Sequence, residues 1–122
     1  ESAGMRIESI KNCSFRNIKL TNVWSKGIQL INVNNSHFEN ITVLMTNMTE
    51  SGATLLYVGT PNESSSNNTF RNLYLHGGYG EWGAHGGICF SYGSNNNIFY
   101  NVSSLYNDNG VYGGGDCLKP LN

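Results

Sequence analysis

Residues 76–85, His-Gly-Gly-Tyr-Gly-Glu-Trp-Gly-Ala-His, form the stretch of the chain whose side chains could do the most chemistry. Glu81, His76 and His85 carry the titratable groups that general acid–base catalysis uses. Tyr79 and Trp82 carry aromatic faces that accept the C–H groups of a sugar ring. The competing interpretation is a Gly-rich bulge whose aromatic side chains cover a flank of the fold or contact another subunit. The spacing alone leaves both open.

A second candidate site combines carboxylates with a Gly-rich loop. Asp108 lies in an Asn-Asp-Asn-Gly run and Asp116 follows three consecutive glycines, and hard oxygen ligands on a flexible loop suit Ca²⁺. A plain turn explains the same residues, so we expect no cofactor beyond this candidate calcium. Together with Glu81 and His85, the two aspartates complete the set of candidate catalytic residues.

Soft metal ligands are present without a diagnostic arrangement. They are His37, His76, His85, Met45, Met48 and the three cysteines. No close pair among them has the spacing of a known metal-binding motif. The sequence therefore predicts no transition-metal site.

A short sequence motif that occurs four times predicts the elements that must position these residues. This repeat phrase is Asn-x-x-Phe-x-Asn followed by an aliphatic residue. It fills residues 12–17, 35–40, 67–72 and 96–101, with steps of 23, 32 and 29 residues between the phenylalanines. Self-similarity at such a period is typical of stacked repeats.

A second phrase, Gly-apolar-x-apolar, alternates with the first. Its copies begin at Gly4, Gly27, Gly52 and Gly87, with a decayed fifth copy at Gly110. Two phrases in alternating register are hard to produce by chance, so we expect about four to five short coils.

Each repeat contains short apolar pairs with a period of two, such as Ile28 and Leu30, which indicates short strands with one buried face. No stretch has a sustained helical stripe. We expect an all-β chain in which about three short strands per coil pair in parallel with their equivalents ~4.8 Å away. Like residues would then stack, giving an internal column of Phe15, Phe38, Phe70 and Phe99 and an internal amide ladder of Asn17, Asn40, Asn72 and Asn101.

These phrases, clearest from Gly87 to Phe99, resemble the right-handed parallel β-helix repeats of the pectate-lyase-like superfamily, in particular the carbohydrate-binding and sugar-hydrolysis type. The resemblance covers nearly the whole chain. It implies a solenoid fold, but that fold hosts lyases, hydrolases, epimerases, adhesins and viral spikes. The Asn-Thr-Asp, Gly-His-Gly and Arg-Ile-Lys motifs of the polygalacturonases are absent.

The residue after each repeat phenylalanine should face outward. These residues are Arg16, Glu39, Arg71 and Tyr100. Their charge alternates along the column, which favours pairing among them over carboxylate chemistry.

Length and composition limit the alternatives. The 122 residues predict a single β-helix domain over residues 1–122, possibly a fragment of a longer β-helix, with insertions at 59–66 and 76–85. The net charge is −1 and only 12% of residues are charged, so we expect no nucleic-acid partner. The sequence contains no apolar run of 18 residues, so we expect no membrane span. The repeat is already in register at Gly4 and has few coils, so we expect exposed strand edges at both ends of the stack. Three explanations are open: the chain is a fragment, its tails form irregular caps, or copies stack end to end.

Seven sequons favour an extracellular or cell-surface location. Asn34, Asn47 and Asn62 fall between repeat phrases and are the better glycan acceptors, followed by Asn12 and Asn67. Asn40 and Asn101 belong to the predicted amide ladder, where a glycan would not fit. Three cysteines are an odd number, which leaves one unpaired or makes an intermolecular bridge. Cys89 lies between two apolar positions and should face away from the core.

The leading hypothesis is an extracellular, glycosylated structural or interaction module that self-associates end to end, into a filament or surface layer, or binds other extracellular proteins. The first alternative is a polysaccharide-acting lyase, hydrolase or epimerase, or a fragment of one. The second is a non-catalytic carbohydrate-binding module that uses Trp24, Tyr79 and Trp82.

Overall fold

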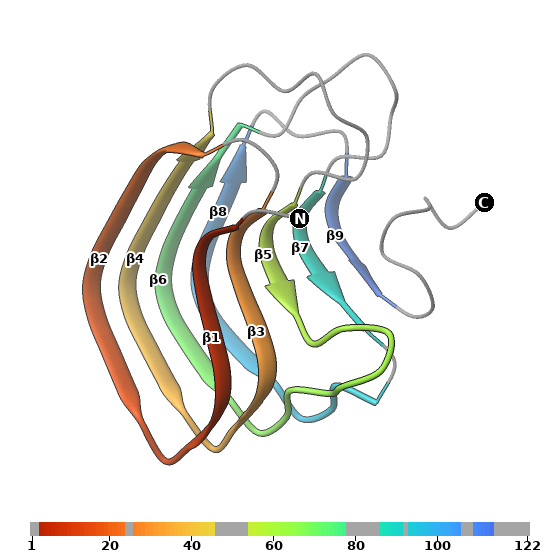
Figure 1. The fold of residues 1–122 in the computed structure, drawn as a ribbon. Helices are drawn as coiled ribbons and strands as arrows, with labels where there is room; N and C mark the ends of the chain where they lie inside the picture. Colours follow the sequence, from red (N-terminus) through yellow and green to blue (C-terminus); the bar gives the residue numbers. More distant parts are fainter. Residues whose placement is uncertain are drawn as a thin grey trace.

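A computed structural model describes residues 3–23, 26–45, 54–77, 86–91, 93–105 and, for the backbone, 109–113. These residues form two parallel sheets that face each other (Figure 1). The first sheet has the order β1 (Ala3–Lys11), β3 (Lys26–Asn34), β5 (Thr54–Val58), β7 (Gly86–Phe90) and β9 (Asn109–Gly113). The second has the order β2 (Ser14–Val23), β4 (His37–Met45), β6 (Thr69–His76) and β8 (Ile98–Leu105).

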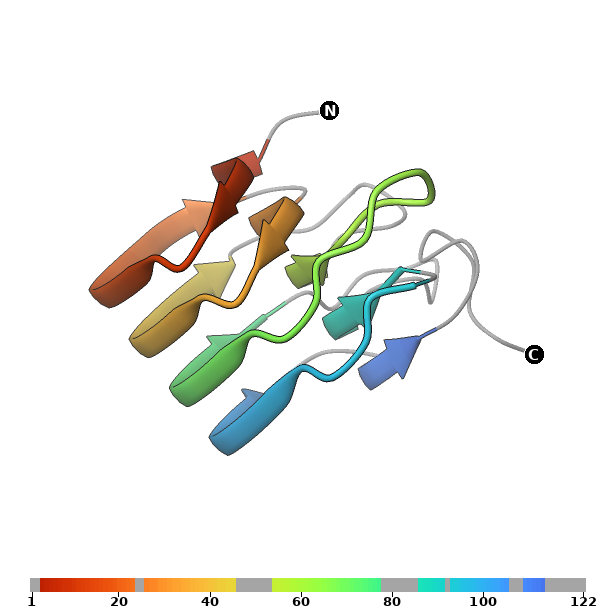
Figure 2. The ribbon, with the colours of Figure 1, turned by 90° about the horizontal axis from the view of Figure 1, so that it is seen from below.

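The chain alternates between the two sheets, so each coil contributes one strand to each. Figure 2 shows the coils displaced one after another along the stack. The predicted all-parallel β-helix is therefore confirmed, and the described residues contain no helix. The expectation of about three short strands per coil is wrong for the described residues, which form two sheets. The reason is that pairing continues through the bends within a strand, so shorter segments merge into one.

Asparagine makes those bends. The asparagines that open the repeat phrase have φ between 52° and 58°, and so do those that close it. This left-handed conformation is costly for most residues, whereas asparagine tolerates it because its short amide bonds locally. Asn17 shows the effect, since β2 turns at this residue between Phe15 and Ile18 while its pairing to β4 continues on both sides. The repeated asparagines thus return the chain to the same position in every coil.

The predicted aromatic column is confirmed. Neighbouring rings of Phe15, Phe38, Phe70 and Phe99 stack with centroids 5.0, 4.9 and 4.5 Å apart. Phe38 and Phe70 are each 1% exposed, whereas Phe15 and Phe99 at the two ends of the column are only half-buried. Between the sheets lies a void of about 10 Å³, too small for a ligand. The core is therefore a close-packed stack.

The register of the Gly phrase is wrong in its third copy. The structure pairs Lys26 with Thr54 and Ile28 with Leu56, so Leu55, not Gly52, occupies the position equivalent to Gly27. Glycine is required at position 27 for a local reason: a Cβ there would collide with the carbonyl oxygen of Leu55. Because that constraint comes from the next coil, it does not have to recur in each repeat.

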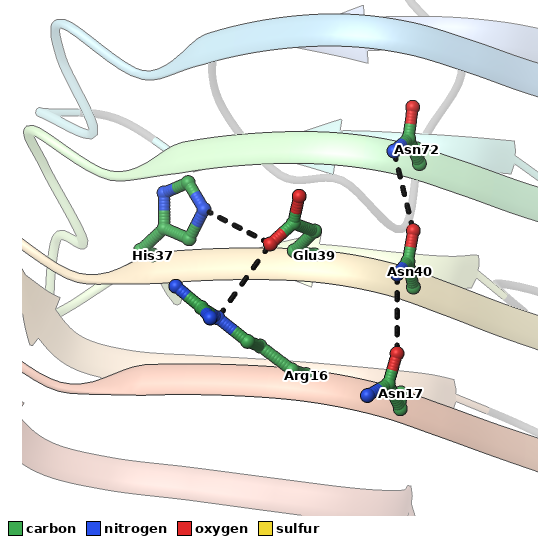
Figure 3. Close-up of polar contacts among 6 residues, drawn as sticks. All are labelled: Arg16, Asn17, His37, Glu39, Asn40 and Asn72. Atoms are coloured by element: carbon green, nitrogen blue, oxygen red, sulfur yellow. Dashed lines mark hydrogen bonds and ion pairs between the residues drawn. The ribbon is translucent and has the colours of Figure 1, made fainter.

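The amide ladder exists, but its predicted interior position is wrong. Asn40 Nδ2 donates to Asn17 Oδ1 at 3.1 Å and Asn72 Nδ2 to Asn40 Oδ1 at 3.2 Å (Figure 3). Asn101 Nδ2 continues the ladder with a bond to Asn72 Oδ1 at 2.9 Å. All four side chains are exposed. At a left-handed residue the side chain leaves the inward and outward alternation of the strand, and here it points to solvent.

A second polar ladder, which the sequence did not reveal, lies inside the bend that precedes each repeat phenylalanine. It consists of Ser36, Asn68 and Asn97. Asn68 is fully buried; its Nδ2 donates to Val33 O at 2.9 Å and to Asn97 Oδ1 at 3.1 Å, and its Oδ1 accepts from Ser36 N at 3.0 Å. These bonds satisfy the backbone groups that the bend removes from the sheets.

We predict that Phe70→Ala will lower the free energy of unfolding by ~3–5 kcal/mol, through lost burial and a cavity. Phe99→Ala, in the half-buried ring at the end of the same column, should lose only ~1–2 kcal/mol. Urea denaturation followed by intrinsic fluorescence or circular dichroism measures both. Equal losses would contradict the difference in burial.

The two polar ladders should also differ in energy. Asn68→Ala leaves the Ser36 N–H without its buried acceptor, while Val33 O keeps only its bond from Ser66 N, and we expect a cost of ~2 kcal/mol. Asn72→Gly keeps the positive φ in the exposed ladder, and water replaces the lost amide, so we expect a cost of about 1 kcal/mol or less. The same denaturation assay compares the variants, and a larger loss for Asn72→Gly would reverse our assignment of which ladder matters.

Candidate interaction surface

Most of the predicted site residues lie outside the described residues. These are the candidate catalytic residues Glu81, His85, Asp108 and Asp116, the candidate aromatic ligands Trp24, Tyr79 and Trp82, and the sequon Asn47. His76, the first residue of the Gly-rich segment, is described and ends β6. The acid–base and calcium hypotheses therefore stay predictions, and the surface below is built from the two sheets.

The two sheets differ in how much of their outward face is accessible. On the first sheet, the register brings Arg6, Gln29, Tyr57 and Cys89 into one outward row. Arg6 on the edge strand β1 is exposed, whereas Gln29, Tyr57 and Cys89 are 8%, 4% and 0% exposed. Lys26 is also buried, with Nζ 5.4 Å from the centroid of the Tyr57 ring. The outward side chains of the second sheet are instead partly or fully exposed. The second sheet therefore offers the accessible surface for a partner.

The central outward row of the second sheet is the predicted one, because the register aligns Arg16, Glu39, Arg71 and Tyr100 across β2, β4, β6 and β8. Arg16 Nε lies 3.5 Å from Glu39 Oε2, and His37 Nε2 lies 3.9 Å from the same oxygen (Figure 3). The Arg71 guanidinium lies 4.5 Å from the centroid of the Tyr100 ring. The row is thus made of paired groups, as the alternation of charge along it predicted.

A further outward row places Tyr74 on β6 beside the central one. Tyr74 is 41% exposed and stacks on His76, with ring centroids 6.0 Å apart. Ile98, Tyr100 and Leu105, all on β8, are 44–49% exposed. We call the outward side chains of β6 and β8 the aromatic half of the surface. His76 is one of the acid–base candidates predicted from the sequence, whereas Tyr74 was not singled out, although its alternation with the buried Leu73 and Leu75 could have revealed it.

Charge adds a second property to this surface. Arg16, Lys19 and Arg71 oppose the single carboxylate of Glu39, so the outward side of the second sheet carries net positive charge although the whole chain has a net charge of −1. Exposed cations beside flat aromatic rings can bind polar or anionic groups and stack on ring faces. Because the sheet forms the support, the surface is broad and regular.

Within the described ranges, no group of three or more His, Cys, Asp or Glu side chains could hold a metal ion. A search of the same residues for a helix long and apolar enough to cross a membrane found none.

The described sequons differ in their surroundings. Asn62 lies in the loop between β5 and β6 and is exposed. Asn34 is only partly exposed: its Nδ2 donates to Asn32 Oδ1 and its Oδ1 accepts from Ser66 N. Asn12, Asn40, Asn67 and Asn101 are exposed, all at bends with positive φ. Asn62 is thus the acceptor with the least structural restraint.

The cysteines also differ. Cys89 faces away from the main core, as predicted, and packs with Tyr57 in a separate small cluster. Cys89 is disulfide-bonded, whereas Cys13 is a free thiol. A disulfide is typical of oxidising compartments.

Comparison with known families agrees with this architecture. The family described as "right handed beta helix region" matches residues 2–117 of the chain. The chain belongs to the right-handed β-helix family. The match defines the hand of the coil and covers the complete repeat region. No curated protein matches the chain at a significant level. Membership in the β-helix family establishes the architecture and leaves ligand and activity to the site itself.

In a eukaryotic secretion system, we expect Asn62 to be glycosylated and Asn34 to remain unmodified, because Asn62 is exposed in a loop whereas the Asn34 side chain is partly buried and bonded to Asn32 Oδ1 and Ser66 N. Peptide mapping before and after enzymatic deglycosylation measures occupancy. Asn62→Gln should remove one glycan mass. A modified Asn34 beside an unmodified Asn62 would contradict the assignment.

Proposed function

We propose that this β-helix is an extracellular structural and interaction module whose working surface is the outward side of β2, β4, β6 and β8. The observation that carries the proposal is the contrast between the two sheets, since the outward Gln29, Tyr57 and Cys89 of β3, β5 and β7 are buried, whereas the second sheet presents exposed aromatic and cationic side chains. A parallel sheet holds these side chains at fixed spacing, so a partner meets a preorganised surface. The sequons and the Cys89 disulfide support an oxidising, extracellular setting.

The geometry favours binding over catalysis on this surface. The Glu39 carboxylate lies 3.5 Å from Arg16 Nε and 3.9 Å from His37 Nε2, so it takes part in ion-pair contacts, and it is the single carboxylate on the four strands of the second sheet. Most glycosidases use a pair of carboxyl groups on either side of the scissile bond, and this surface provides one. The enzyme alternative therefore depends on Glu81, His85, Asp108 and Asp116, outside the described residues.

The second candidate function, carbohydrate binding, is favoured by the aromatic half. The Tyr74 and Tyr100 rings are exposed, and the Arg71 guanidinium beside Tyr100 provides hydrogen-bond donors. Sugar rings stack on such aromatic faces, and guanidinium groups pair with hydroxyl or carboxylate oxygens. A glycan chain lying across β6 and β8 would use both, so carbohydrate is the partner class to test first.

We predict micromolar to millimolar binding of at least one glycan on an array of neutral and acidic polysaccharide fragments, confirmed by calorimetry. Arg71→Ala and Tyr100→Ala should each weaken that binding ~10-fold, about the loss of one charged contact or stacking partner. Arg6→Ala is the matched control, because Arg6 is an equally exposed arginine on the edge strand of the first sheet.

Equal losses for Arg71→Ala and Arg6→Ala would indicate non-specific charge attraction and contradict the assigned surface. Release of shorter fragments from any glycan, abolished by Glu81→Gln or Asp116→Asn in a folded protein, would instead establish the enzyme alternative. Binding only to protein ligands, with the same dependence on Arg71 and Tyr100, would keep the surface and exclude carbohydrate.

A further inference from the structure

Two sequons lie within the exposed asparagine ladder of the second sheet. Asn40-Ile41-Thr42 belongs to β4, and Asn101-Val102-Ser103 belongs to β8. The prediction that a glycan does not fit at these asparagines depends on an interior ladder, whereas both side chains are exposed. Asn40 is the more informative of the two, because β4 pairs with a described strand on each side. The exposed ladder thus allows a modification that an interior ladder would exclude.

The ladder uses only one of the two N–H groups of the Asn40 side chain. Oδ1 accepts from Asn72 Nδ2 on one side, and Nδ2 donates to Asn17 Oδ1 on the other (Figure 3). Because these two bonds run in opposite directions, the bonded hydrogen is the one trans to Oδ1 in the planar amide. The second hydrogen lies parallel to the Cβ–Cγ bond, toward solvent, and it has no acceptor among the described residues.

N-glycosylation replaces one hydrogen of such an amide. Nδ2 attacks the anomeric carbon of an oligosaccharide carried on a polyisoprenyl pyrophosphate. The new N–C bond forms as the C–O bond to the pyrophosphate breaks, the lipid pyrophosphate leaves with the electron pair, and Nδ2 gives one proton to a base of the transferase. The product is a secondary amide, which strongly prefers the trans form, so the sugar takes the place of the outward hydrogen. The hydrogen that bonds Asn17 is kept, and the ladder continues through the modified residue.

A sugar on Asn40 would stand between two outward rows of the second sheet. The central row lies on one side, where Glu39 Oε2 is 3.5 Å from Arg16 Nε. The register forms the row on the other side from Lys19, Thr42, Tyr74 and Ser103. Tyr74 is 41% exposed and pairs directly with Thr42 of the sequon. A glycan at this point would therefore cover the ring of Tyr74 and the groups next to it.

We propose that Asn40 is an N-glycosylation site and that its glycan controls access to the outward side of the second sheet. The inference rests on the proposed extracellular setting, because this modification takes place during secretion. The two ladder bonds of Asn40 hold the first sugar at a fixed point above β4. The surface then has two forms, one open to partners when Asn40 is bare and one partly covered when Asn40 is modified.

Peptide mapping by mass spectrometry of the chain secreted from a eukaryotic cell tests the modification. We expect a glycan on the peptide that contains Asn40, and its loss in Thr42→Val, which removes the sequon hydroxyl and keeps both ladder bonds. Asn72 is the internal control, since it occupies the same ladder but is followed by Leu73 and Tyr74 and should stay bare. A bare Asn40 in the folded wild-type protein would overturn the proposal.

Hydroxyl-radical footprinting tests the control of access. The glycosylated wild type is compared with Thr42→Val and with Asn40→Asp, which lacks the acceptor amide but keeps the oxygen to which Asn72 donates. We expect Tyr74 to be labelled ~2-fold or more faster in both variants, because the bulky glycan is absent, while labelling of Met5 on β1 stays unchanged. Circular dichroism verifies folding. Tyr74 labelled as slowly in either variant as in the wild type would overturn the proposed shielding.

Failure of this inference differs from failure of the proposed function. A modified Asn62 beside a bare Asn40 would overturn only the inference. A chain that carries no glycan at any sequon would contradict the extracellular setting as well. A glycan array without a ligand would contradict carbohydrate binding and would leave the mass of the Asn40 peptide as predicted here.

Discussion

The structure depends on one constraint: every coil must bring the chain back to the same place, and asparagine in the left-handed conformation makes that return possible. The asparagines that open and close the repeat phrase bend the backbone at the same two points of each coil. Once the bends coincide, parallel pairing aligns equivalent residues of successive coils. The aromatic column, both polar ladders and the outward rows all follow from that alignment, because each is one repeat position read along the stack.

The sequence predicted what the repeat phrase itself specifies and failed where the determining contact lies elsewhere. The phenylalanine column and the Arg16 row followed from equal spacing. The predicted alignment of Gly52 with Gly27 is wrong, because Gly27 is required by its close approach to the Leu55 carbonyl of the next coil. No local sequence pattern reports that contact. Asn17 and its equivalents were placed inside because strand alternation was assumed to hold at residues whose φ interrupts it. Ser36, Asn68 and Asn97 were missed because their ladder combines different residue types.

The candidate surface was harder to predict than the fold for a related reason. Alternation tells which side chains leave the core, but Tyr57 and Tyr74 both leave it, and one is buried while the other is exposed. Alternation does not tell which of the outward side chains the rest of the fold covers. Residue types in the Gly-rich segment suggested chemistry there, whereas the described surface with matching properties lies on the regular strands of the second sheet.

The half-buried phenylalanines at the two ends have a consequence for how the molecule opens. In a stack where each coil contacts only its neighbours, the cost of detaching a coil depends on the single interface that it loses. Among the described coils, those that hold Phe15 and Phe99 each pack against one neighbour, while those of Phe38 and Phe70 are held from both sides. The exchange rate of the backbone amide hydrogens should therefore vary along the stack, fastest in the outer described strands and slowest in β4 and β6. Local unfolding would then begin at the outer coils and proceed toward the middle.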